Sequence, residues 1–78
     1  MTAELILENP WSYQLFLTKN GYVLSVPYGS SAITEINIGI SDEEAQAGIN
    51  DHVRLESLAA GVRQNAQAFS EFEVALEK

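Results

Sequence analysis

Apolar and polar residues alternate along the first half of the chain. Residues 11–18 and 22–28 each carry an apolar side chain at every second position, which is the period of a β-strand. The dipeptide Asn20–Gly21 between them favours a tight hairpin turn, in which both central residues adopt positive φ. With this turn at the tip, Lys19 faces Tyr22 and Leu17 faces Leu24. The hairpin then has a core face made of Tyr13, Leu15, Leu17, Tyr22, Leu24, Val26 and Tyr28.

Two further runs predict strands on either side of this hairpin. Residues 3–7 are a short apolar run that Asn9–Pro10 ends. Residues 32–40 alternate again, and the pattern turns three isoleucines inward and Glu35 outward, together with Asn37 and Gly39. Because consecutive strands usually pair as neighbours, we expect a four-stranded antiparallel meander.

The pattern changes to a helical period after residue 40. Ser41 to Glu44 form a capping box, in which the Ser41 hydroxyl accepts from the Glu44 backbone N–H. This first helix is expected to end by Gly48, and Asn50 or Asp51 can cap a second one. The second helix carries an apolar stripe with helical spacing, made of Leu55, Leu58, Ala59, Val62, Ala66 and Phe69.

Gly61 lies inside the second helix, where glycine costs about 1 kcal/mol relative to alanine. We expect it to be there because the helix approaches the sheet closely. Residues 71–77 alternate once more, which favours a final strand, with a frayed helical tail as the alternative. Residues 1–78 are therefore predicted to be a single α+β domain, a four-stranded antiparallel meander followed by two helices on one face.

The two helices are both needed to cover the inner face of the sheet, so the outer face is expected to be bare. Phe16 and Val23 fall on this outer face, and Pro27 and Ile6 are candidates to join them. Apolar side chains clustered on an uncovered sheet face indicate an interface. One hypothesis is therefore self-association into a homodimer through Phe16, Val23 and Pro27.

Charge limits the partners that the chain can have. Eleven acidic residues oppose four basic ones, so the net charge is −7. Such a chain is repelled by nucleic acids and by anionic membranes, and it is suited either to solubility or to a basic partner. No apolar run is long enough for a membrane helix, and no basic region precedes the first apolar run. We therefore expect a cytoplasmic protein.

Residues that could carry chemistry are sparse. The chain has no cysteine, and its single histidine, His52, has no nucleophile placed beside it by any motif. Ser30 and Ser31 lack the strand-to-helix turn of a nucleophilic serine. The acids from Asp42 onward do not follow the spacing of a calcium loop. We expect no enzyme activity, no metal and no cofactor; the catalytic alternative is a pocket that gathers Tyr13, Tyr28, Ser30 and His52.

Four stretches of the chain resemble a pattern found in short acidic bacterial proteins. These are Trp11–Ser12–Tyr13, "GYVLSVPYGS", "EINIGISDEEA" and "LAAGVRQNAQAF", which together span residues 11–69. Some proteins of this kind are immunity proteins of secreted-toxin systems. Where that pattern continues as Arg-x-Asn-Pro, this chain has Ala66 in place of the proline. The resemblance implies a single-domain inhibitor that binds a cognate toxin and has no catalytic residues.

The leading hypothesis is therefore a protein-binding module of the immunity type, whose partner is a basic toxin such as a nuclease. Carboxylates would steer the association and pair with the partner's Lys and Arg side chains. The candidate carboxylates are those of Glu35, Asp42, Glu43, Glu44 and Asp51. Aromatic side chains of the hairpin would anchor the contact. The candidate anchors are Trp11, Tyr13 and Tyr28.

Overall fold

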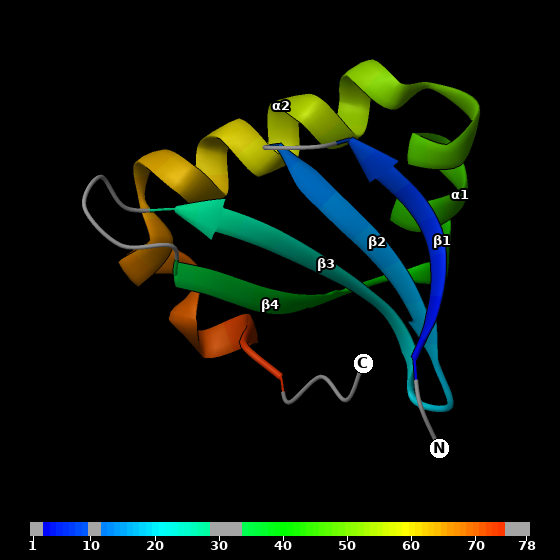
Figure 1. The fold of residues 1–78 in the computed structure, drawn as a ribbon, viewed down its shortest axis with the longest axis horizontal. Helices are drawn as coiled ribbons and strands as arrows, with labels where there is room; N and C mark the ends of the chain where they lie inside the picture. Colours follow the sequence, from blue (N-terminus) through cyan, green and yellow to red (C-terminus); the bar gives the residue numbers. More distant parts are fainter. Residues whose placement is uncertain (1–2, 10–11, 29–33, 75–78) are drawn as a thin grey trace.

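The computed structural model describes residues 3–9, 12–28 and 34–74, of which Tyr28 and Thr34 are described by their backbone alone. A four-stranded antiparallel sheet in the order β1-β2-β3-β4 is followed by helices, and α1 and α2 lie over one of its faces (Figure 1). The predicted α+β meander is therefore confirmed. The elements are β1 (Glu4–Asn9), β2 (Tyr13–Thr18), β3 (Gly21–Tyr28), β4 (Thr34–Ile40), α1 (Asp42–Asn50), α2 (His52–Gln64) and the 3₁₀ helix η1 (Ala66–Phe72).

The register of the β2–β3 hairpin differs by two residues from the predicted one. Leu15 pairs with Leu24 and Thr18 pairs with Gly21, so the loop residues are Lys19 and Asn20. The Thr18 hydroxyl closes this loop, since it accepts from the Asn20 backbone N–H at 3.1 Å and donates to the Gly21 carbonyl at 2.9 Å. Gly21, with φ at 119°, supplies the left-handed backbone that the chain needs to re-enter the sheet. A shift of two residues leaves every side chain on its predicted face.

The main core lies between the inner sheet face and α2. The hairpin contributes Tyr13, Leu15, Leu24 and Val26 as the alternation predicted, and β4 turns Ile36 and Ile38 inward as expected; the predicted Leu17 is not part of this core. Helix α2 contributes part of its predicted stripe. The buried members of this core are Tyr13, Leu15, Leu24, Val26, Ile36, Ile38, Leu55, Ala59 and Val62.

A β-bulge in β1 changes the side that Ile6 faces. Leu5 pairs with Phe16 and Leu7 pairs with Leu15, so Ile6 is the extra residue between the two pairs. Ile6 and Leu7 both pack against the main core. The prediction that Ile6 joins an outer apolar cluster is therefore wrong, because the bulge breaks the strict alternation on which it depended.

The prediction of a bare outer face is also wrong. Phe16 and Val23 are each only 5 % exposed within the single chain. They pair with each other in the two central strands, flanked by Leu5 on β1 and Gly39 on β4. The C-terminal segment reaches the same face, since a Cβ built on Gly39 would lie 3.6 Å from Val74 Cγ1. These two side chains offer little surface to a second copy of the chain.

The polypeptide leaves α2 earlier than the apolar stripe predicted. The Asn65 N–H donates to the carbonyls of Gly61 and Val62 at 3.1 and 3.2 Å, and η1 follows. The expected strand over residues 71–77 is not formed at 71–72, which lie in η1. Glu73 makes an isolated antiparallel bridge with Ile38, and residues 75–77 lie outside the described part of the chain.

The glycine that allows a close approach between elements is Gly48 in α1, and not the predicted Gly61 in α2. A Cβ built on Gly61 meets nothing within 4 Å, so the expected close approach to the sheet is absent there. A Cβ on Gly48 would instead collide with Leu55, in contact with its Cγ and 2.6 Å from its Cδ2. The close approach is therefore between the two helices, where buried Gly48 receives the Leu55 side chain.

Candidate functional site

The first turn of α1 places three carboxylates in solvent. The Glu44 backbone N–H donates to the Ser41 hydroxyl at 3.1 Å, and this hydroxyl lies 3.4 Å from Glu44 Oε1, to which it donates. The predicted cap is therefore present, and it begins the helix at Asp42. Acidic side chains are favourable at this end because the helix dipole is positive there. Asp42, Glu43 and Glu44 are all exposed.

Asp51 is the single residue between α1 and α2. Its backbone N–H donates to the Ala47 carbonyl at 2.9 Å, which closes α1. Its Oδ1 accepts from the Val53 N–H at 3.2 Å, which caps α2. One exposed aspartate thus ends one helix and begins the next.

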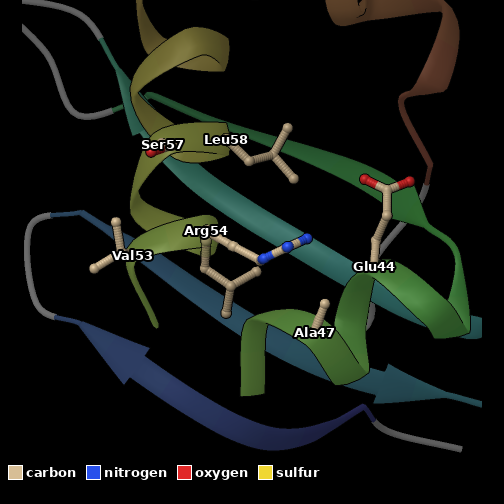
Figure 2. Close-up of a pocket in the computed structure, with 7 residues that line it drawn as sticks. Glu44, Ala47, Val53, Arg54, Ser57 and Leu58 are labelled. Atoms are coloured by element: carbon tan, nitrogen blue, oxygen red, sulfur yellow. The ribbon is translucent and has the colours of Figure 1, made fainter. Parts of the chain in front are cut away.

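An open groove of about 350 Å³ lies between these helices (Figure 2). Its lining is mostly apolar, and Glu44 and Arg54 are the two charged residues in it. Val53 is 65 % exposed although it is a large apolar residue. The lining residues are Glu44, Ala47, Val53, Arg54, Leu55, Ser57 and Leu58. We use the name α1–α2 face for the exposed surface of the two helices, which includes this groove and the carboxylates of Asp42, Glu43, Glu44 and Asp51.

No described residue neutralises the charges on the α1–α2 face. No ion pair forms between any acidic and basic side chains in residues 3–9, 12–28 and 34–74, apart from contacts that involve Glu35. The Arg54 side chain extends over the groove, in the direction of α1 (Figure 2). It is the one base that lines the groove, and its guanidinium makes no hydrogen bond to a described residue. The groove itself therefore has a mostly apolar lining with one acid, Glu44, and one base, Arg54, while Asp42, Glu43 and Asp51 are exposed elsewhere on the two helices.

Of the five predicted acids, Glu44 lines the groove, Asp42 and Glu43 share the first turn of α1 with it, and Asp51 lies between the two helices, whereas Glu35 is on the sheet. Its position in β4 points to the outer face of the sheet, where the Ser25 hydroxyl donates to Glu35 Oε2 at 2.7 Å. The helices cover the inner face. Glu35 and the α1–α2 face thus lie on opposite sides of the sheet, so including Glu35 in one binding surface is a prediction that the geometry contradicts.

The predicted aromatic anchors are not part of this face. Tyr13 is 3 % exposed in the main core, so its ring cannot contact a partner, and this prediction is wrong. Burial, and then the negative charge of Glu56, raise the pKa of the Tyr13 hydroxyl above its ordinary value, against a hydrogen bond from Asn9. Trp11 and the side chain of Tyr28 lie outside the described residues.

Pro27 is half-buried on β3 and is held by the second helix. Its carbonyl accepts from Arg63 Nε at 3.4 Å, and Arg63 Nη2 donates to the Ser12 carbonyl at 2.9 Å. Arg63 thus ties the end of α2 to β3 and to the residue before β2. The Pro27 carbonyl is thus engaged within the chain, and with Phe16 and Val23 buried the predicted self-association surface is small.

Residues that could support catalysis do not converge. His52 is exposed at the first residue of α2, while Tyr13 is buried, so the two share no open pocket. Ser30 and Ser31 lie outside the described residues. Within the described ranges, no three His, Asp or Glu side chains come together as a metal site. No helix there is long and apolar enough to cross a lipid bilayer.

The apolar half of the α1–α2 face was missed by sequence reasoning. Leu58 was assigned to the core stripe, and it does pack there in part, but it also lines the groove. Val53 falls outside the stripe, and a large apolar residue outside the buried stripe of a helix is a sequence signal for exposed apolar surface. The groove itself depends on the angle between the helices, which no sequence pattern specifies.

Comparison with known proteins places the chain in no established group. It matches no protein-family model, and neither a curated protein nor a solved structure matches it significantly.

Proposed function

We propose that this chain is a non-catalytic protein-binding module that acts as an immunity-type inhibitor of a basic protein toxin. One observation carries the proposal: the two helices expose four carboxylates, none in an ion pair with a described residue, and one of these, Glu44, lines an open and largely apolar groove. Carboxylates that are not in an ion pair are available to a basic surface, and those of Glu44 and Asp51 also accept hydrogen bonds at the helix ends. A nuclease channel is basic because it binds phosphates, so its charge is complementary to this face.

The α1–α2 face has charged and apolar groups, which affect the rate of association and the affinity respectively, and this supports the proposal. Exposed carboxylates raise the rate of association with a basic partner and add little to affinity when they are not desolvated. Apolar groups that become buried supply most of the affinity. The α1–α2 face has both kinds of group within one surface. The proposal places this action in the cytoplasm, where a nuclease toxin meets nucleic acid.

Self-association remains the alternative function, and the structure argues against its surface. Phe16 and Val23 are 5 % exposed, so a dimer through the outer sheet face would bury little additional apolar area. Two copies would also each bring a net charge of −7. Light scattering at several concentrations is expected to give the mass of a single chain, and a stable dimer would favour the alternative.

The proposal is tested by coexpressing the chain with the proteins encoded in neighbouring reading frames. We expect one of them to arrest growth when expressed alone, to be tolerated in the presence of the chain, and to be recovered with it in a pull-down. If the chain forms no complex with any of these proteins, the proposal is contradicted.

A charge-neutralised variant then locates the contact. Asp42→Asn, Glu43→Gln and Asp51→Asn together change the net charge from −7 to −4 and keep Ser41, Glu44 and the cap at position 51. We expect the association rate to fall by about tenfold at low salt, because electrostatic steering contributes factors of this order.

A matched control removes the same charge elsewhere. Glu4→Gln, Glu71→Gln and Glu73→Gln also leave a net charge of −4, and all three side chains are exposed away from the α1–α2 face. The control is expected to keep most of the association rate. If both triple variants slow association equally, only the overall charge matters and the face is wrongly assigned.

A further inference from the structure

The loop between β2 and β3 exposes an asparagine directly before a glycine. Asn20 is exposed, and Gly21 has a backbone φ of 119°. A Cβ built on Gly21 would meet nothing within 4 Å, so no neighbouring atom crowds this part of the backbone. Thr18 and Asn20 also line a hollow of about 230 Å³. The Asn20 side-chain amide and the Gly21 backbone nitrogen therefore have room to react, and water reaches them.

These two groups form a cyclic imide without a catalyst. The Gly21 nitrogen attacks Asn20 Cγ, an N–Cγ bond forms, and the side-chain nitrogen leaves as ammonia, which takes the proton that the Gly21 nitrogen loses. One water molecule then opens the ring, adding OH to a carbonyl carbon and H to the nitrogen. Breaking the N–Cγ bond gives aspartate. Breaking the original backbone C–N bond gives isoaspartate, in which the backbone runs through the side chain.

The sequence and the sheet disfavour this reaction at two other asparagines. Asn9 precedes Pro10, and a proline nitrogen has no proton to lose. Asn37 precedes Ile38, which is 2 % exposed and pairs with Leu24 within the sheet. A backbone nitrogen in the middle of a strand has to leave the sheet before it can reach a neighbouring side chain.

The remaining two asparagines lie at helix ends. The nitrogen after Asn50 belongs to Asp51, and its N–H donates to the Ala47 carbonyl at 2.9 Å, which holds it at the end of α1. Asn65 precedes Ala66, whose methyl group crowds a nitrogen that glycine would leave accessible. The asparagines of the chain thus form an internal comparison, in which the one in the hairpin loop is expected to react first.

The Thr18 hydroxyl opposes the reaction. It accepts from the Asn20 backbone N–H at 3.1 Å and donates to the Gly21 carbonyl at 2.9 Å, and Thr18 and Gly21 are the last pair of the hairpin. Closing the imide ring needs a rotation between Asn20 Cα and its carbonyl carbon, because the Gly21 nitrogen must reach Cγ. The two hydrogen bonds hold the loop against this rotation. The reaction therefore proceeds when the end of the hairpin opens, which costs little free energy at a loop tip.

We infer that Asn20–Gly21 is a site of spontaneous modification, at which asparagine is converted to aspartate and isoaspartate, and that the Thr18 hydroxyl slows the conversion. Either product adds a carboxylate and changes the net charge from −7 to −8. Isoaspartate also lengthens the backbone by one carbon just before Tyr22, whose hydroxyl accepts from Gln46 Nε2 of α1 at 3.0 Å. The modified loop therefore disturbs a contact with the first helix. The site does not depend on the proposed inhibitor function.

The experiment incubates the folded chain at neutral pH and physiological temperature for several weeks. Peptide mapping by mass spectrometry locates each residue at which an amide NH₂ has become OH, and a carboxyl methyltransferase specific for isoaspartate separates the two products. We expect conversion at Asn20 and none at the other asparagines. Asn20→Gln keeps a neutral amide and the net charge, but its longer side chain would need a six-membered ring, which closes far more slowly. We expect this variant to show no conversion at position 20.

Two substitutions at one position test the hydroxyl. Thr18→Val keeps the β-branched shape that suits a strand and removes both hydrogen bonds of the hydroxyl. We expect it to convert Asn20 about two- to tenfold faster than the parent chain, as the loss of one or two exposed hydrogen bonds predicts. Thr18→Ser keeps the hydroxyl and should convert at the parent's rate. Far-UV circular dichroism checks that both variants are folded.

Several outcomes would overturn the inference. No conversion at Asn20, or equal conversion at another asparagine, removes the site. Conversion that persists in Asn20→Gln removes the imide route, and equal rates for Thr18→Val and Thr18→Ser remove the role of the hydroxyl. In the isoaspartate form we expect the side-chain amide signals of Gln46 to shift in a ¹⁵N spectrum. Unchanged signals would refute the link between the loop and α1.

Discussion

The contact between Gly48 and Leu55 predicts opposite effects for two glycine-to-alanine substitutions in adjacent helices. Alanine in place of glycine in a helix interior is worth about 1 kcal/mol from helix propensity. At position 61 nothing lies within 4 Å of the new methyl group, so the gain is kept. At position 48 the methyl group would lie against Leu55 Cγ, 2.6 Å from its Cδ2 and 3.0 Å from its Cδ1.

Leu55 has little room to move away from this methyl group. Its side chain is 2 % exposed and packs in the main core with Ala59 and Val62. Overpacking of a core costs about 1–3 kcal/mol. The new methyl group would meet the branched Cγ itself, so we expect a cost in the upper half of this range, about 2–3 kcal/mol; after the helix-propensity gain is subtracted, Gly48→Ala should destabilise the fold by about 1–2 kcal/mol. Gly61→Ala should stabilise it by about 0.5–1 kcal/mol.

Urea unfolding followed by far-UV circular dichroism measures the change in the free energy of unfolding for both variants, and thermal unfolding measures the change in melting temperature. In a chain of this size, 1 kcal/mol shifts the melting temperature by about 4–8 °C, so the two variants should differ clearly. Leu55→Ala, which itself costs about 2–5 kcal/mol, removes the obstacle, so adding Gly48→Ala to it should be neutral or stabilising. If Gly48→Ala is as stable as the parent chain, or if its cost persists in the Leu55→Ala background, the packing argument is refuted.

Three other predictions follow from local contacts. Ser41→Ala removes the cap of α1 and should cost about 1 kcal/mol in thermal or urea unfolding, while Ser41→Asp should retain most of that stability. Arg63→Ala removes the hydrogen bonds to the Ser12 and Pro27 carbonyls and should cost about 0.5–1.5 kcal/mol, a discounted value because Arg63 is exposed, and Arg63→Lys should rescue little of it. The raised pKa of Tyr13 means that the folded chain holds this proton when the unfolded chain, with a pKa near 10.0, has lost it. Its contribution to stability is therefore complete below pH 10 and is lost as the pH rises toward the folded-state pKa, so Tyr13→Phe should show a shallower decline in urea stability above pH 10 than the parent chain.

The candidate site was predictable in its charges and unpredictable in its shape. Asp42, Glu43, Glu44 and Asp51 follow from the capping signals, since caps lie at helix ends in solvent. The same pattern also contained the information that separates Glu35 from them, because it turned Glu35 outward while assigning both helices to the inner face. The groove needs the angle between α1 and α2, and this angle is set by one capping residue and by the fit of Leu55 against Gly48.

Local periodicity alone was sufficient to identify the four strands of the sheet, the two α-helices and, apart from Ile6, the face on which the described apolar side chains of the sheet lie. Periods of two and of 3.6 residues are properties of single elements, so they can be read before any element meets another. The tertiary structure decided the two-residue shift of the hairpin, the bulge at Ile6, the burial of Phe16 and Val23, and the glycine at which two elements touch. Each of these depends on which distant atoms arrive at a given point in space, and neither composition nor spacing along the chain carries that information.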